Sequence, residues 1–341
     1  MNRYNERQLK KETLTQVLSK ISGKNIIDVS YQTKQLQGGT LGEVWLVTGM
    51  AEAADGLKQP YKVVLKIQKK WERYGDPDSW RREYDLYRSE LGKVFTDSFR
   101  WPECYFLEIK DEEIQIWMEY IDGISGLDLT GEMYERAAEE IGRFQGRLYA
   151  EQPTFFRNLN NLSSVDYAKN YYLHYRSWEV VYNYIRSDEC DIPRHLCKML
   201  IDLDENADEI FSRIEKLPKV LCHRDFWVAN IFYSDDKIRI IDWDTAGWGY
   251  LGEDLASLIA DEADVEHMVD YYHRCIPAYY KGFSEYADLS HITDPCIREI
   301  ILIMFGYRLI EWYMFAESSD AKTQHLKTLQ KIYEFEGIQM N

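Results

Sequence analysis

Three polar residues, His223, Asp225 and Asn230, form the pattern H-x-D-x-x-x-x-N, and Asp242 follows them within an apolar run. Phosphoryl transfer needs a group that accepts the proton of the nucleophile and oxygen ligands for a divalent cation. Carboxylate and amide oxygens suit a hard cation such as Mg²⁺. The residue types and their spacing therefore predict phosphoryl-transfer chemistry.

The elements around these residues must bring them together. Two short β-rich runs, residues 231–233 and 238–241, lie on either side of Asp235-Asp236, which predicts a hairpin turn. A loop that carries Asp225 and Asn230, followed by a hairpin that ends at Asp242, places all three at one edge. The alternative is that the first two residues cap turns and Asp242 is an ordinary strand-end carboxylate.

The following segment reads I-D-W-x-x-A-x-x-G and then D-L-A at Asp254. With the upstream motif, it resembles the aminoglycoside phosphotransferase and choline kinase family, whose members are relatives of the protein kinases. The resemblance implies Asp225 as the catalytic base, Asn230 and Asp242 as Mg²⁺ ligands, and ATP as the donor, with GTP not excluded. It also implies that Asp254 braces the catalytic loop through its backbone and that His223 is structural. Arg224 stands where the family more often has Gly, and its role is left open.

The first part of the chain contains candidates for binding the nucleotide. Gly38, Gly39 and Gly42 lie in a turn between β-rich runs, where glycines let backbone N–H groups approach phosphate oxygens. Lys66 lies in the β-rich run 63–67, from which its ammonium could reach the α- and β-phosphates; the alternative is a solvated strand lysine. The family pairs such a lysine with a helix glutamate, and Glu83 is the best match.

Two weaker candidates for that glutamate, Asp85 and Glu90, lie in the same predicted helix, residues 78–91. The last strand of the first part ends in four residues that look like the family's hinge, whose backbone would bind adenine: Met118, Glu119, Tyr120 and Ile121.

The order of elements predicts an α+β protein with two lobes. A helix within residues 1–25 precedes a mostly strand-forming stretch to residue 120, in which residues 50–60 read as a polar turn region. The resemblance implies a protein-kinase-like fold, with a small antiparallel-sheet nucleotide-binding lobe (1–121) and a larger, mostly helical catalytic and substrate-binding lobe (122–341). Five helices are expected in the second lobe, at about 132–150, 164–187, 193–216, 254–282 and 295–316.

Charge is unevenly distributed along the 341 residues, which carry a net charge of −17. Residues 1–120 hold 19 Lys+Arg and 19 Asp+Glu, so the remaining 22 (41 − 19) and 39 (58 − 19) leave the whole imbalance in residues 121–341. An acidic surface repels nucleic acid and anionic membranes and attracts cations. This favours a cationic partner and predicts neither a nucleic-acid nor a membrane partner. The alternative is that the charge only maintains solubility.

Several features indicate a cytoplasmic protein. The N-terminal residues are polar and charged, unlike a signal peptide. The most apolar window, 300–315, is too short to span a bilayer and contains Arg308 and Glu311. The six cysteines form no C-x-x-C pair, which predicts free thiols in a reducing compartment.

The acceptor is less clearly indicated. Only 12 positions (254 − 242) separate Asp242 from Asp254, which leaves little room for the peptide platform of a protein kinase and favours a small acceptor. We expect a cationic, aminoglycoside-type hydroxyl compound, with Asp261 and Glu311 as candidates for residues that contact it. Alternative acceptors are choline or ethanolamine and a sugar. An alternative function is that of a non-catalytic, kinase-like nucleotide-binding protein. Oligomeric state, and a role in antibiotic resistance or in metabolism, are left open.

Overall fold

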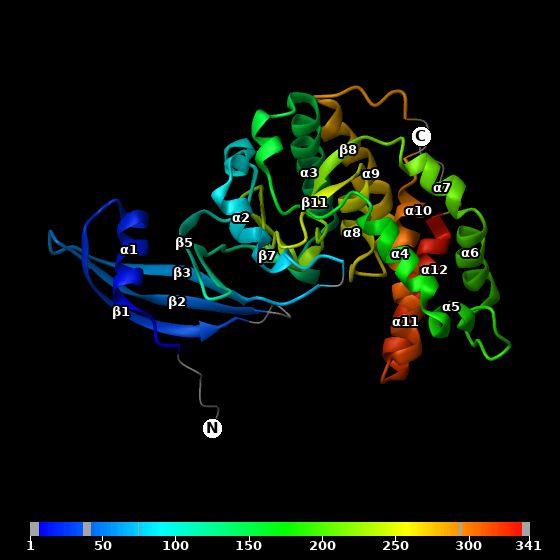
Figure 1. Cartoon of the computed structure of the whole chain (residues 1–341), viewed down its shortest axis with the longest axis horizontal. Helices are drawn as coiled ribbons and strands as arrows, with labels where there is room; N and C mark the ends of the chain where they lie inside the picture. The colour runs from blue at the N-terminus through cyan, green and yellow to red at the C-terminus, as the bar shows by residue number, and fades with distance from the viewer. Residues whose placement is uncertain (1–6, 37–41, 74, 293–294, 336–341) are drawn as a thin grey trace. The chain divides into compact units, whose positions relative to one another are not determined.

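Two units, each with its own core, make up the structure. The computed structural model describes residues 7–36, 42–73, 75–292 and 295–335. Unit 1 comprises residues 1–93 and 101–122, and unit 2 comprises residues 94–100 and 123–341. Figure 1 shows strands dominating the first unit and helices dominating the second.

A five-stranded antiparallel sheet forms the body of unit 1, in the order β1-β2-β3-β6-β5. This confirms the predicted antiparallel sheet. The prediction of a polar turn over residues 50–60 was wrong, because the strands continue through most of that stretch and bury Ala51 and Ala53. Residues 54–57 alone join the two strands. The strand bounds are β1 Ile26–Gln35, β2 Gly42–Ala53, β3 Lys58–Lys69, β5 Cys104–Lys110 and β6 Glu113–Glu119.

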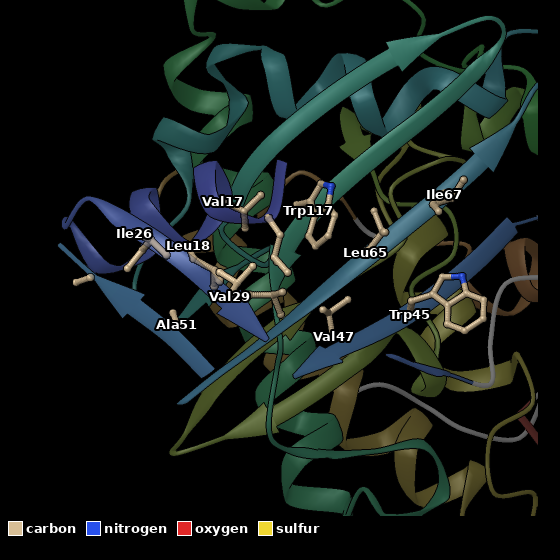
Figure 2. Close-up of a cluster of buried hydrophobic side chains, with 13 residues drawn as sticks. Val17, Leu18, Ile26, Val29, Trp45, Val47, Ala51, Leu65, Ile67 and Trp117 are labelled. Atoms are coloured by element: carbon tan, nitrogen blue, oxygen red, sulfur yellow. The ribbon is translucent and has the colours of Figure 1, made fainter. Parts of the chain in front are cut away.

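The two faces of this sheet carry different cores. Helix α1 (Lys11–Ser22) buries Leu14, Val17 and Leu18 in a cluster with side chains from the sheet (Figure 2). The helical segment made of η1 (Ser79–Arg81) and α2 (Arg82–Arg88) packs on Val64 through Trp80 and Tyr84. Because strand side chains alternate between faces, Lys66 lies on the same face of β3 as Val64. Strand alternation therefore directs Lys66 towards α2.

Helices make up most of unit 2, as predicted, but they are shorter and more numerous. The stretch 164–187 is interrupted at Trp178, whose ψ of 89° is not helical. The stretch 193–216 is interrupted at Asn206, and 254–282 is interrupted by the loop 261–267. The bounds are α3 Gly131–Glu151, α4 Tyr167–Ser177, α5 Glu179–Tyr184, α6 Arg194–Glu205, α7 Ala207–Ile214, α8 Glu253–Ala260 and α9 Met268–Ser284.

The end of the chain contains a helix with an irregular centre and a further helix that was not predicted. Helix α10 (Ile297–Ile301) continues through a π-helical turn (Leu302–Gly306) into α11 (Tyr307–Phe315). Helix α12 (Ser319–Glu334) follows, with the Ser318 side chain accepting a hydrogen bond from the N–H of Ala321. No helix in the described part of the chain is both long and apolar enough to span a bilayer.

Helices α3 and α9 approach each other closely through glycines. A Cβ atom at Gly142 would lie 2.2 Å from the carbonyl oxygen of Tyr279, and one at Gly282 would lie 2.1 Å from that of Glu139. Only residues without a side chain allow this backbone approach. The close packing places Gln145 of α3 within hydrogen-bonding distance of residues at the candidate site.

Short strands in unit 2 surround the motif identified in the sequence. Strands β9 (Ile231–Ser234) and β10 (Lys237–Ile240) form the predicted hairpin, and Asp235 and Asp236 in its turn have φ angles of 51° and 62°. Strand β4 (Phe99–Arg100) pairs with β10, and β7 (Ile124–Ser125) pairs with β9. A separate antiparallel pair, β8 (Lys219–Cys222) and β11 (Gly247–Tyr250), was not predicted.

Candidate active site

The loop between β8 and β9 is held in place by the carboxylate of Asp254, in the first turn of α8. Its two oxygens accept hydrogen bonds from the backbone N–H groups of His223 (2.9 Å) and Arg224 (2.7 Å). Gln145 donates a third from its side-chain amide, at 2.8 Å. Burial nevertheless raises the pKa of Asp254 to about 7, against the lowering effect of these backbone donors. Asp254 therefore fixes the loop through its backbone, as the resemblance implied.

His223 connects this loop to the segment that carries Asp242. Its Nε2 lies 3.0 Å from the carbonyl oxygen of Ile241, and its Nδ1 lies 3.3 Å from the backbone N–H of Asp225. A neutral ring with the proton on Nε2 satisfies both contacts. The ring also packs edge-on against Trp243, with centroids 4.6 Å apart. His223 is thus a structural residue that sets the position of Asp225 relative to the following hairpin.

Asp225 and Asn230 are joined directly. The side-chain amide of Asn230 donates to Oδ2 of Asp225 at 2.7 Å and to its backbone carbonyl at 3.0 Å. The N–H of Ile241, next to Asp242, donates to the backbone carbonyl of Asn230 at 3.0 Å. The structure therefore brings all three predicted residues to one edge of the β9–β10 hairpin.

Electrostatics at Asp225 are unusual for a carboxylate. Burial raises its pKa to about 7, and the charges of Asp242 and Asp261 act in the same direction, whereas the hydrogen bond from Asn230 lowers it. Several acidic side chains thus act on one partly buried carboxyl group. A cation bound there would reduce this repulsion.

The donor set fits a magnesium ion. Because Asn230 donates through its amide nitrogen, its carbonyl oxygen is the atom that remains as a metal ligand, and Asp242 supplies a carboxylate. No group of three or more His, Cys, Asp and Glu side chains suited to a metal occurs in the described ranges. Mg²⁺ is commonly held by one or two carboxylates together with substrate phosphates, so a sparse protein ligand set is adequate.

In unit 1, Lys66 and Glu83 form an ion pair. Their Nζ and Oε2 atoms are 2.5 Å apart, and the side chains are 12% and 2% exposed. The weaker candidates face other partners: Asp85 pairs with Arg81 at 3.0 Å, and Glu90 pairs with a lysine in its own turn. The geometry therefore selects Glu83 among the three acidic residues considered.

Other residues proposed to bind the nucleotide are less informative. Gly38 and Gly39 lie outside the described residues. Gly42 begins β2, where a Cβ atom would lie 2.7 Å from the carbonyl oxygen of Ile67, so its small size serves strand pairing. Met118 and Glu119 end β6, and Tyr120 and Ile121 follow directly.

Arg224, left without a role by the sequence, has a clear structural environment. Its φ angle is 67°, a left-handed conformation that favours glycine, which accounts for the glycine more often found there in the family. Its side chain is 1% exposed; the guanidinium lies 3.6 Å from Glu253, donates to the carbonyl of Trp248 and covers the ring of Tyr167 at 4.8 Å. These contacts tie the loop to β11 and α8, and neither they nor the positive φ could be read from the sequence pattern.

Both candidate residues for contacting the acceptor have protein partners. Asp261, at the end of α8, pairs with Arg308 of α11 at 2.9 Å. Glu311, one turn further along α11, accepts a hydrogen bond from the hydroxyl of Tyr175. Both lie in unit 2.

Comparison with known proteins agrees with this arrangement. The family model described as "APH: Phosphotransferase enzyme family" matches residues 35–285. No match was found among curated proteins.

Solved structures with similar folds include three kinases of small molecules. Choline kinase from Cryptosporidium parvum Iowa II is 17% identical, with a TM-score of 0.56 over 89% of this chain and 90% of that chain. The GDP complex of aminoglycoside 2'-phosphotransferase-IIIa is 15% identical, with a TM-score of 0.57 over 96% and 100%. Amicoumacin kinase hAmiN, with AMP-PNP, Ca²⁺ and Ami, is 14% identical, with a TM-score of 0.54 over 96% of each chain. These similarities confirm the predicted kinase-like fold class.

Proposed function

Because the chain belongs to the phosphotransferase enzyme family, we propose that it transfers the γ-phosphoryl group of ATP to a hydroxyl group of a small molecule. The observation that carries this proposal is the joining of Asp225 and Asn230 beside Asp242 on a loop braced by Asp254. GTP is an alternative donor, since one structural relative was solved with GDP.

The residues have distinct roles in this proposal. Asp225 orients the acceptor hydroxyl and accepts its proton, which requires the ionised carboxylate. Lys66, oriented by Glu83, neutralises charge on the α- and β-phosphates. Asn230 and Asp242 would hold Mg²⁺, which, when bound, neutralises charge on the phosphate oxygens. The rate enhancement comes mainly from positioning and electrostatics.

We propose a cationic acceptor, on the basis of the acidic charge in residues 121–341. The names of the structural relatives include both choline kinase and an aminoglycoside phosphotransferase, so choline-type and aminoglycoside-type compounds are the first to test. A sugar is an alternative acceptor, and a non-catalytic nucleotide-binding protein is an alternative function. If the acceptor is an aminoglycoside-type compound, we propose that the protein is cytoplasmic and that its role is antibiotic resistance.

The test is Mg²⁺-dependent release of ADP from ATP across aminoglycosides, choline, ethanolamine and simple sugars. We expect Asp225→Ala to lower kcat by roughly 10²–10⁴, the usual effect of losing a general base, while ATP still binds. Asp242→Ala should abolish Mg²⁺-dependent nucleotide binding. Asp235→Asn, in the exposed hairpin turn, is the matched control and should have native activity. A near-native kcat in Asp225→Ala would exclude Asp225 as the base.

A further inference from the structure

An aromatic stripe on unit 2 begins beside the catalytic loop. Along α4, the rings of Tyr167 and Tyr171 stack at 6.4 Å, Tyr171 and Tyr175 meet edge-on at 5.1 Å, and Tyr175 stacks on Trp178 at 6.4 Å. Trp178 in turn stacks on Phe315 of α11 at 6.0 Å, and Phe315 is 59% exposed. We call these five residues the aromatic stripe.

Two links connect the aromatic stripe to Asp225. Its first ring, Tyr167, lies under the guanidinium of Arg224, the residue before Asp225. Further along, α4 packs against the π-helical turn and α11, from which Arg308 reaches Asp261 at 2.9 Å. Asp261 directly follows α8, the helix whose first turn carries Asp254, which holds the loop that contains Asp225. The aromatic stripe is therefore connected to the loop in two ways, directly through Tyr167 and indirectly through the packing of α4 on α11.

Charge on this face is largely compensated within the protein. Arg308 neutralises Asp261 and also lies over the ring of Trp312, with the guanidinium carbon 4.2 Å from the ring centroid. Glu311 accepts a hydrogen bond through Oε2 from Tyr175, and among the described residues no partner is found for its Oε1. Tyr175 itself is buried, whereas Tyr167, Tyr171 and Trp178 are half-buried and Phe315 is exposed. The face thus presents partly exposed rings beside a Glu311 oxygen that is available to an ammonium group.

We propose that this face binds the acceptor, and that the acceptor is a hydroxyl compound with one flat ring and one ammonium group. The ring stacks on the aromatic stripe, the ammonium group pairs with Glu311, and Arg308 disfavours polycations because it holds Asp261 neutralised. This inference rests on the proposed function, and it narrows the cationic acceptor to a monocation.

The test measures binding by titration calorimetry, with probes that separate ring from charge. The probes are 2-amino-1-phenylethanol (ring and one ammonium), 1-phenyl-1,2-ethanediol (ring only), ethanolamine (ammonium only) and kanamycin (several ammonium groups). We expect 2-amino-1-phenylethanol to bind at least about tenfold more tightly than each of the other three probes. This is the gain that one charge-assisted contact adds to ring stacking. Weaker binding of this probe than of kanamycin, or no binding of it, overturns the proposal.

Variants assign the effect to residues. Glu311→Gln should weaken binding of 2-amino-1-phenylethanol about tenfold and leave the diol unchanged, whereas Glu317→Gln, at an exposed position beyond α11, should change neither. Arg308→Gln should release Asp261 and tighten kanamycin binding about tenfold, and the double variant D261N/R308Q should reverse that gain. Unchanged binding in Glu311→Gln, or no gain in folded Arg308→Gln, refutes the assignment.

The two proposals fail separately. Binding needs no phosphoryl transfer, so the expected binding pattern without Mg²⁺-dependent ADP release would refute the proposed function alone. Conversely, ADP release could depend on Asp225 while binding of the acceptor does not depend on Glu311. That result would refute the proposed acceptor-binding face and leave the proposed function intact.

Discussion

Replacing Asp225 with asparagine should stabilise the nucleotide-free protein while removing its activity. The folded-state pKa of Asp225 is raised from 3.8 to about 7, chiefly by burial and then by Asp242. The folded protein therefore keeps a proton that the unfolded chain has lost between about pH 4 and pH 7. Stability of the native protein falls as pH rises through this window. The amide introduced by Asp225→Asn cannot ionise, and its oxygen can still accept the hydrogen bond from Asn230.

The size of the effect follows from the shift. About three pK units at 1.36 kcal/mol each give an upper limit of about 4 kcal/mol above pH 7. Because Asp225 is only partly buried, solvent screens part of this effect, and we expect about 2 kcal/mol. The gain should be small near pH 4, grow up to pH 7 and then level off.

Denaturant unfolding of both proteins from pH 4 to 9, without Mg²⁺ or nucleotide, measures this difference. Saturating Mg²⁺ and ATP should reduce it, since binding favours the ionised carboxylate in the native protein. Asp235→Asn, which replaces an exposed aspartate in the β9–β10 turn, should follow the native curve. Parallel curves for the native protein and Asp225→Asn across this pH range would show that the protein does not destabilise the ionised form of Asp225.

Three other changes test the site and its surroundings. Both Arg224→Gly and Arg224→Ala should lose the contacts of the guanidinium. In denaturant unfolding, Arg224→Ala should be less stable than Arg224→Gly by about 1 kcal/mol, because only Gly adopts a φ of 67° without strain. Equal stability of the two variants would contradict this. Lys66→Ala should lower kcat/KM for ATP about 10²-fold or more, with a smaller loss in Glu83→Gln, measured by ADP release; a native value in Lys66→Ala would remove its role. The sulfur atoms of Cys190 and Cys197 are 3.6 Å apart, so hydrogen peroxide should oxidise the two thiols to a disulfide with release of water. Mass spectrometry should show the loss of two hydrogens, and Cys190→Ser should prevent this loss. Thiols that stay intact would count against the prediction.

The local structure of the candidate catalytic segment was predictable from the sequence because its residues are close along the chain. Asp225 and Asn230 share one loop, and the hairpin that leads to Asp242 is short enough to be seen in the β-rich runs on either side of Asp235-Asp236. The pairing of Lys66 with Glu83 required the resemblance, because nothing local distinguishes Glu83 from Asp85.

Helix ends and tertiary partners were harder to predict. The apolar periodicity continues across Trp178 and Asn206, so backbone breaks there leave no clear signal in the pattern. Polar residues around 50–60 indicated a turn, although pairing with neighbouring strands extends the sheet through most of them. The partners of Arg224 and Asp261 come from other elements, and only the folded chain brings them together.

The π-helical turn at Leu302–Gly306 makes the register of α11 sensitive to insertions and deletions. A π turn contains one residue more than an α turn, so deleting one residue there would restore a regular helix. Every side chain beyond it would then rotate by about 100° around the helix axis relative to α10. Arg308 would leave Asp261, and Glu311 would leave Tyr175, without any change in either residue. Length variation in this turn is thus a route by which descendants of this chain could change acceptor.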